Sequence, residues 1–291
     1  AERTCDAIDC AYDSTAATIN VSETTSFKGV AMTVKEVMPY AFYENNHIKE
    51  VNIAHKGNIG DYAFYNCDSI LSVELSNEGN IGIKAFYDND GIQEIIVPNS
   101  VMSLGQYCFY DCDSLKSVVL GDGVSAISDY AFSACSSLND VEIGSSVATI
   151  NNYAFQNCSS LPTITIPQAV TTIGDNVFAG CSNLSDVIIT DRTEPLALGS
   201  NDPSPLFADC PLDSVYIGGK ITYSTTSSKG YSPFYRNTSL RTVVITDREE
   251  QIYDNEFYGC TNLQNVTIGN GVKSIGNYAF SGCSSLAGFS F

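Results

Sequence analysis

The sequence has little positive charge, no tryptophan, two histidines and no long apolar run. Lysine and arginine number 14 against 33 acidic residues, which gives a formal net charge of −19. Nucleic-acid binding needs basic residues at the phosphates, and an anionic membrane repels a chain of this charge. The longest apolar runs are a few residues, too short to span a bilayer. We therefore expect no nucleic-acid partner and no membrane insertion of this segment.

Residues that commonly carry out catalysis are also scarce. His47 and His55 are interpreted as exposed polar residues, and the sequence has no Gly-x-Ser-x-Gly, Gly-x-x-x-x-Gly-Lys or His-Glu-x-x-His motif. Acidic stretches such as Glu249-Glu250 and Asp111–Asp113 lack the repeated Gly-Gly-x-Gly-x-Asp phrase of calcium-binding β-solenoids. They favour a solvated acidic surface, and calcium binding stays open. The sequence predicts no catalytic residue, no cofactor and no metal site, and thus a non-enzymatic protein.

One phrase is present eleven times. Each copy has an aromatic anchor, a Cys or Asn three residues later, a Leu or Ile, and a short alternating apolar run. A phrase that recurs mostly every 22 to 23 residues is typical of a solenoid, in which each coil buries its apolar face against its neighbours. The anchors are Phe42, Phe64, Phe86, Phe109, Phe132, Phe155, Phe178, Phe207, Phe234, Phe257 and Phe280.

Each copy also predicts a short strand. Apolar and polar residues alternate, as in Val141-Glu142-Ile143, which is the pattern of a half-buried strand. Gly or Pro then follows, as at Gly144 and Pro167, and a second short extended piece fits in the remainder of the coil. We predict a β-rich solenoid of about eleven coils over residues 34–291, with one parallel sheet, few or no long helices, and an N-terminal cap at residues 1–33.

Eight of the eleven cysteines fall three residues after an anchor, where other copies have Asn45, Asn89 and Asn237. This alternation predicts a buried position whose thiol or amide meets the backbone of a neighbouring coil. Parallel side chains on stacked coils are too far apart at Cβ for a disulfide, and thiols spread along a line do not converge on zinc. Cys5 and Cys10 lie outside the repeats, and they could form a disulfide within the cap.

The repeated phrase resembles the BspA-like branch of the leucine-rich repeat superfamily, which carries I-x-x-x-A-F-x-x-C-x-x-L-x-x-I-x-I-P. Residues 150–155, Cys158, Leu161 and residues 164–167 reproduce it almost letter for letter. The Asn or Cys that follows the strand in general leucine-rich repeats is absent here, since Ser146 and Ala169 stand there. The resemblance implies a right-handed superhelix and a secreted or cell-surface protein that binds extracellular proteins of a host or neighbouring cell. It implies no catalytic residues.

Strand side chains that point away from the core define the surface on which we expect a partner. The acids Asp140, Glu142 and Asp186 are followed in later coils by an apolar row of Ile188, Tyr216 and Val244. Exposed apolar rows often mark contact surfaces. The period breaks beside this row at residues 190–206 and 218–233, which are predicted as loop insertions. We expect an extracellular protein to bind the sheet face and the 190–233 loops.

Two other functions stay open. Tyrosines one residue after several anchors could stack against a glycan, and the chain could instead be a structural spacer of a larger surface protein. Because the sequence stops within a strand phrase, we expect truncation, a further domain or end-to-end association. The tyrosines in question are Tyr43, Tyr65, Tyr87, Tyr110, Tyr235 and Tyr258.

Overall fold

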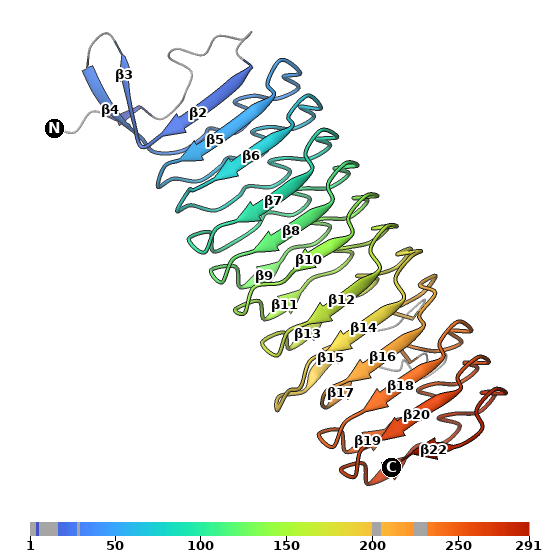
Figure 1. Cartoon of the computed structure of the whole chain (residues 1–291). Coiled ribbons are helices and arrows are strands. Elements are labelled where there is room, and N and C mark those ends of the chain that lie inside the picture. The colour runs from blue at the N-terminus through green and yellow to red at the C-terminus, as the bar shows by residue number, and fades with distance from the viewer. Residues whose placement is uncertain (1–3, 6–16, 28–29, 200–204, 224–231, 291) are drawn as a thin grey trace. The chain divides into compact units, whose positions relative to one another are not determined.

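The computed structural model describes residues 4–5, 17–27, 30–199, 205–223 and 232–290. In this part of the chain every regular element is a β-strand, and none of these residues forms a helix that is long and apolar enough to cross a membrane (Figure 1). The chain divides into two compact units, Ala1–Ser146 and Val147–Phe291. Each unit is a parallel β-solenoid, which confirms the predicted fold class.

The first unit contains two three-stranded parallel sheets on the predicted strand face. Strands β2, β5 and β6 form one sheet, and β7, β8 and β10 form the other. Near the N-terminus, β3 and β4 pair as an antiparallel hairpin, and β1 adds in parallel to β4. The bounds are β1 (Thr4–Cys5), β2 (Thr18–Ser22), β3 (Thr24–Phe27), β4 (Val30–Val34), β5 (Glu50–Ala54), β6 (Ser72–Leu75), β7 (Glu94–Val97), β8 (Ser117–Leu120), β9 (Ala126–Ile127) and β10 (Asp140–Glu142).

The residues assigned to the N-terminal cap also supply a solenoid strand. The apolar pattern at residues 17–21 predicted a strand, and β2 pairs in parallel with β5, with Thr18 opposite Glu50 and Val21 opposite Ile53. The first strand of the strand face thus lies within residues 1–33. Cys10 and the side chain of Cys5 lie outside the described residues, so their disulfide stays a prediction.

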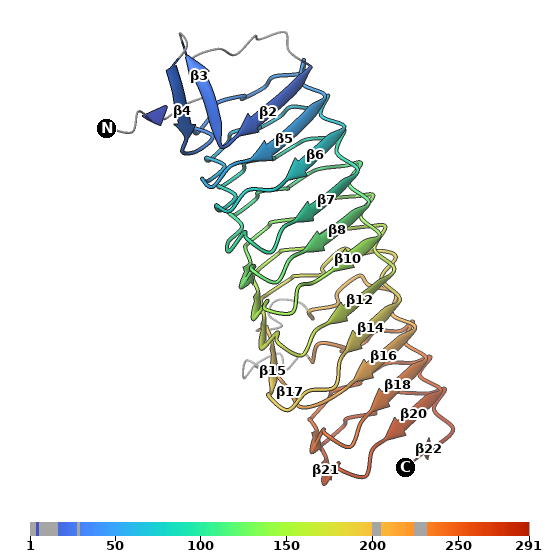
Figure 2. The ribbon, with the colours of Figure 1, turned by 60° about the vertical axis from the view of Figure 1, so that its left-hand side comes forward.

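The second unit has a six-stranded parallel sheet in the order β12, β14, β16, β18, β20 and β22 (Figure 2). On another side of its coils, β11, β13, β15 and β17 are neighbours in a second sheet, and β19 pairs with β21. The bounds are β11 (Thr149–Ile150), β12 (Thr163–Ile166), β13 (Thr172–Ile173), β14 (Asp186–Ile189), β15 (Leu196–Leu198), β16 (Ser214–Ile217), β17 (Ile221–Thr222), β18 (Thr242–Ile245), β19 (Gln251–Ile252), β20 (Asn265–Ile268), β21 (Ser274–Ile275) and β22 (Phe289–Ser290).

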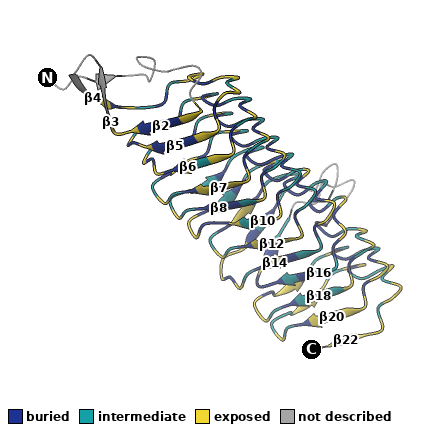
Figure 3. Ribbon diagram, turned by 45° about the horizontal axis from the view of Figure 1, so that its top comes forward, coloured by how far each residue is buried: buried dark blue, intermediate teal, exposed yellow. Residues whose placement is uncertain are grey.

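The strand alternation separates core from surface as the sequence predicted. In β12, Ile164 and Ile166 are buried, whereas Thr163 and Thr165 are exposed, and the same alternation recurs along both units (Figure 3). Val73 and Val141, which were predicted to point inward like their equivalents, are only half-buried. The valine in β6 lies where the strand face of the first unit is interrupted.

The anchor phenylalanines form a stack of buried rings in each unit. Ring centroids are 4.8 Å apart for Phe42 and Phe64 and 5.4 Å apart for Phe109 and Phe132, with nearly parallel planes. The spacing in the second unit is similar, from 5.4 Å for Phe257 and Phe280 to 6.0 Å for Phe155 and Phe178. Such rings contribute the largest apolar area per residue, and truncation of one inside a stack to Ala costs about 3–5 kcal/mol.

The position three residues after each anchor is a row of hydrogen-bond donors. The Cys67 thiol donates to the Phe42 carbonyl oxygen at 3.0 Å, and Asn89 Nδ2 donates to the Phe64 carbonyl oxygen at 2.8 Å. Cys and Asn can replace each other here because both supply a donor for a backbone carbonyl of the preceding coil, although Asn237 donates to the Cys210 carbonyl oxygen at 2.7 Å and not to that of an anchor. The nine cysteines from Cys67 to Cys283 are free, and burial raises the pKa of the Cys67 thiol to about 12. These thiols pack the core and are poor nucleophiles.

Both insertions, which were predicted as loops, contain a short strand. β15 continues the row of β11 and β13, and β17 follows it with Leu196 opposite Ile221. Just before β15, Arg192 is buried and its guanidinium donates to the carbonyl oxygens of Val170 at 2.6 Å and Pro167 at 2.9 Å. The first insertion therefore rejoins the solenoid before residue 200. Residues 200–204 and 224–231 lie outside the described residues.

Candidate binding surface

The predicted apolar row forms one patch on the six-stranded sheet. Ile188, Tyr216 and Val244 lie on β14, β16 and β18 and are direct partners in the parallel register. Ile188 is 37% exposed, and Tyr216 and Val244 are half-buried. Thr165 and Thr267 occupy the same register position on the flanking strands and are exposed. We refer to Ile188, Tyr216 and Val244 as the apolar strip.

The first insertion is hydrogen-bonded to this strip. Tyr216 OH donates to Asp191 Oδ1 at 2.7 Å, and Asp191 Oδ2 lies 4.0 Å from Arg248 Nε. The hydrogen bond to Asp191 is the main cause that raises the pKa of Tyr216. Sequence analysis placed the insertion near the strip but missed Asp191 and Arg248. Their positions in the sequence could have indicated this contact, because both residues closely follow the ends of parallel strands, β14 and β18, and so lie at the same edge of the sheet.

The three predicted acidic residues are divided between the two units. Asp186 begins β14 and is half-buried, and its carboxylate accepts hydrogen bonds from the hydroxyls of Ser214 and Ser185. Both oxygens are thus engaged within the sheet. Asp140 and Glu142 are exposed on β10, in the first unit. The second unit therefore contains the apolar strip and Asp186, and the first contains the other two acids.

A shortened turn leaves a hollow near the start of β16. In most coils two residues separate the Cys or Asn that lies three residues after the anchor from the following Leu or Ile. Cys210 and Leu212 are separated only by Pro211. Two depressions of about 400 Å³ and about 480 Å³ border Pro211 and Ser239. The Arg241 to Asp213 ion pair, with 2.9 Å between Nη1 and Oδ1, lines the second depression. The missing residue was visible in the sequence, although the hollow was not predicted.

The tyrosines that follow the anchors do stack on one another in the first unit. Tyr43, Tyr65, Tyr87 and Tyr110 have centroid spacings of 4.8–4.9 Å and nearly parallel rings. In a second row, Tyr107 and Tyr130 stack at 4.6 Å, and Lys84 Nζ lies 5.0–5.6 Å from the centroids of three tyrosine rings. Stacking covers ring faces between neighbours, so the rows present ring edges and hydroxyl groups.

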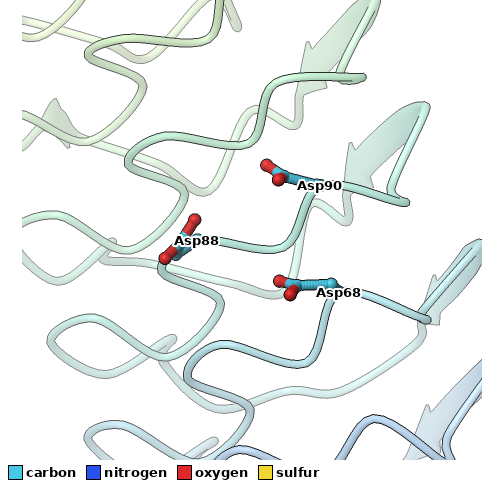
Figure 4. Close-up of side chains that lie close together, drawn as sticks. All are labelled: Asp68, Asp88 and Asp90. Atoms are coloured by element: carbon cyan, nitrogen blue, oxygen red, sulfur yellow. The ribbon is translucent and has the colours of Figure 1, made fainter.

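Three carboxylates lie within reach of one cation in the first unit. Asp68 comes from one coil and Asp88 and Asp90 from the next, and one oxygen of each lies within 4.8 Å of the others (Figure 4). Partial burial and then the charge of Asp90 raise the pKa of Asp68 and of Asp88. The sequence singled out the neighbouring Asp111–Asp113 turn as a solvated acidic surface. The carboxylates are the hard oxygen ligands that calcium takes, although three exposed or half-exposed acids fall short of its usual six to eight ligands.

The two histidines differ in their environment. His47 is exposed, as predicted, but His55 is buried, and the prediction of an exposed residue was wrong. His55 Nδ1 accepts a hydrogen bond from the Gly57 amide at 2.8 Å, and burial lowers the pKa of its imidazole. His55 follows β5 directly, where the chain turns inward, so it packs as a neutral turn residue.

Solved structures that resemble this chain are bacterial leucine-rich repeat proteins. A leucine rich cell surface protein from Faecalibacterium prausnitzii is 22% identical with a TM-score of 0.53, over 94% of this chain and 87% of that protein. A leucine-rich repeat protein from Bacteroides ovatus is 23% identical with a TM-score of 0.46, over 94% and 86% of the two chains. No curated protein sequence matches the chain. At these identities the first likeness supports the fold alone.

The repeat itself matches a family model. The BspA type leucine rich repeat region matches residues 19–89, 79–198, 122–232 and 227–291, which together cover nearly all of the chain. The match agrees with the buried Phe stack, the donor row that precedes each strand, and the parallel register of the strands. The chain therefore belongs to the BspA-type leucine-rich repeat family.

Proposed function

We propose that this protein is a non-enzymatic, secreted or cell-surface binding module that engages an extracellular protein through the apolar strip and the described parts of the 190–233 insertions. The observation that carries this proposal is the in-register alignment of Ile188, Tyr216 and Val244 on the solvent side of three consecutive strands. Apolar side chains on an otherwise polar, acidic surface gain free energy when a partner removes them from water.

The surroundings of the strip support a protein partner. A central aromatic residue flanked by ion pairs is typical of interface hot spots, and Tyr216 is bordered by Asp191 and Arg248. The printed description of the Faecalibacterium relative, a cell surface protein, favours an extracellular location. The hollow around Pro211 lies at the start of the same strands and would add shape to the interface.

The test uses purified protein and a panel of immobilised extracellular matrix and bacterial surface proteins. Tyr216→Ala and Ile188→Asp should each weaken the binding detected with the wild type by about tenfold or more, as for hot-spot residues. Asn265→Asp, on the exposed side of β20, is the matched surface control and should leave binding unchanged. Folded Tyr216→Ala and Ile188→Asp proteins with wild-type affinity would remove the strip from the proposal.

Glycan binding through the tyrosine rows is the alternative function. Its support is the long display of tyrosine hydroxyls in the first unit, but a sugar needs an open ring face to stack, and neighbouring rings cover one another. A glycan array probed with the wild type and with Tyr87→Ala separates the two functions. A spacer role remains the third alternative, and it predicts no binding in either assay.

A further inference from the structure

The strand face of the first unit is interrupted between β6 and β7. Among the described residues, β6 pairs with β5 and β7 pairs with β8, but no ladder joins β6 to β7. The backbone hydrogen bond that links neighbouring coils just before their strands is missing here as well. The Leu71 amide donates to Lys49 and the Lys116 amide donates to Gln93, each at 2.8 Å, whereas no such bond links Gln93 to Leu71.

Proline explains why the ladder cannot close at the other end of these strands. The residue after β6, Ser76, donates its amide to the Ile53 carbonyl at 2.7 Å, and Gly121 after β8 donates to Val97 at 2.9 Å. The equivalent residue after β7 is Pro98, which has no N–H to donate to Leu75. The edges of β6 and β7 thus face each other with backbone groups that do not form a ladder.

The gap between these strands opens a slot on the solvent side of the sheet. A hollow of about 380 Å³ is lined by residues of β6 and β7 and by the residues beside them. Leu71 and Ile96 border it and are 57% and 54% exposed, among the most exposed large apolar side chains of the described chain. Val73, whose register partner Val51 is fully buried, is half-exposed to the same opening.

The charge of the slot is negative. Glu74 and Glu94 line it and are exposed, and no Lys or Arg is among its lining residues in the described chain. Lys116 borders the slot only through Gln93, whose Oε1 accepts a hydrogen bond from Lys116 Nζ at 3.1 Å. The slot therefore combines two carboxylates, backbone carbonyls that lack a ladder partner and apolar side chains.

We propose that the β6–β7 slot binds an arginine side chain of a partner peptide or protein. A guanidinium has five N–H donors and no acceptor, so it suits a site made of carboxylates and carbonyls. Its alkyl stem would lie over Leu71 and Ile96 while the charged end lies between Glu74 and Glu94. This site lies in the first unit and does not depend on the apolar strip, so it can be present or absent independently of the function proposed above.

The test measures binding of a fluorescein-labelled peptide, Gly-Ser-Arg-Ile-Arg-Ser-Gly, by fluorescence anisotropy at low salt. The matched probe replaces both arginines with citrulline, which keeps the shape of the side chain and removes its charge. Wild-type protein should bind the arginine peptide and show at least about tenfold weaker binding to the citrulline peptide. Glu74→Gln and Glu94→Gln should each weaken binding of the arginine peptide about fivefold.

Two further variants distinguish the slot from general attraction to an acidic protein. Glu44→Gln removes the same charge from an exposed residue of the first unit, outside the slot, and should leave binding within about twofold of wild type. Leu71→Ser should weaken binding without unfolding the protein, because this side chain is largely exposed. Equal losses in Glu44→Gln and Glu94→Gln, full binding by Leu71→Ser, or equal affinity for both peptides would each overturn the proposal.

Discussion

At the scale of single residues, the fold depends on one donor in each coil that meets one carbonyl. Cys135 donates to the Phe109 carbonyl oxygen at 3.1 Å, and Cys260 donates to that of Phe234 at 3.3 Å. Asn fills the same role through Nδ2, but its Oδ1 must also be accommodated. In Asn89 this oxygen is buried without a hydrogen-bond partner. A thiol fits the position better because it has no strong acceptor to leave unsatisfied.

We therefore expect Asn89→Cys to stabilise the protein. The change keeps a donor for the Phe64 carbonyl and removes a buried unsatisfied oxygen, a gain on the order of 1 kcal/mol in the free energy of unfolding. The reciprocal control, Cys135→Asn, should destabilise by a similar amount. Urea unfolding followed by circular dichroism measures both, and a less stable Asn89→Cys protein would contradict the explanation of the Cys and Asn alternation.

At the scale of elements, interruptions of the repeat bring polar groups into the core. Arg192 fills the interior beside β15, and Glu249 Oε2 accepts the amide of Ile221 at the start of β17. Glu256 precedes an anchor at a position where most coils have Ala, and it is buried. Tyr223, just after β17, has a buried hydroxyl without a hydrogen-bond partner. Burial of these polar groups costs desolvation free energy, which hydrogen bonds offset at Arg192 and Glu249.

This arrangement predicts a pH dependence that Glu256 causes. Burial raises the pKa of Glu256 from 4.5 to about 8. A carboxyl group with a raised pKa in the folded state favours folding fully below its unfolded pKa, and that contribution is lost as the pH rises through the folded value. The free energy of unfolding should therefore fall between about pH 4.5 and pH 8 and then level off.

Glu256→Gln removes the titration and nearly keeps the shape of the side chain. Its stability should change less with pH than that of the wild type across this window, and it should be the more stable protein at pH 8. Denaturant unfolding at pH 5, 6.5 and 8 makes the comparison, with Glu250→Gln as the exposed control. Parallel pH profiles for wild type and Glu256→Gln would refute the assignment.

At the scale of the whole molecule, the thiols report on the integrity of each unit. Cys67, Cys108, Cys112 and Cys135 lie in the first unit and are buried, and the five from Cys158 to Cys283 lie in the second. Because neighbouring coils bury one another's core, we expect the thiols of one unit to become reactive together as that unit unfolds. Cys283 is the exception, since it is only partly buried and lies in the last coil.

Pulsed alkylation followed by mass spectrometry tests this expectation. Among the nine cysteines from Cys67 to Cys283, only Cys283 should react quickly in native protein, and increasing urea should expose the other eight in sets that follow the two units. In fully unfolded protein without reductant, Cys5 and Cys10 should be the two unreactive cysteines if they form the predicted disulfide. Scattered reactivity of single internal cysteines at low urea would contradict cooperative packing within a unit.

The sequence by itself determined the repeat, the alternation of the strands, the anchor stack and the packing role of the cysteines that lie three residues after the anchors. These follow from local periodicity, because the same phrase must find the same environment in every coil. It also predicted that Ile188, Tyr216 and Val244 would share a face, since their places in the phrase are equivalent. His55 was misassigned because burial at a turn depends on how the neighbouring coil covers it.

Only the tertiary structure decided what happens where equivalence between coils fails. The missing ladder at Pro98, the burial of Arg192 and Glu256, and the hydrogen bond from Tyr216 to Asp191 all depend on contacts between residues more than 20 positions apart. A repeat pattern predicts the structure that the coils share. The β6–β7 slot, the Tyr216 to Asp191 hydrogen bond and the buried charged residues depend on how one coil differs from the next. The β6–β7 slot arises from such a difference, whereas the apolar strip lies on equivalent positions of successive coils.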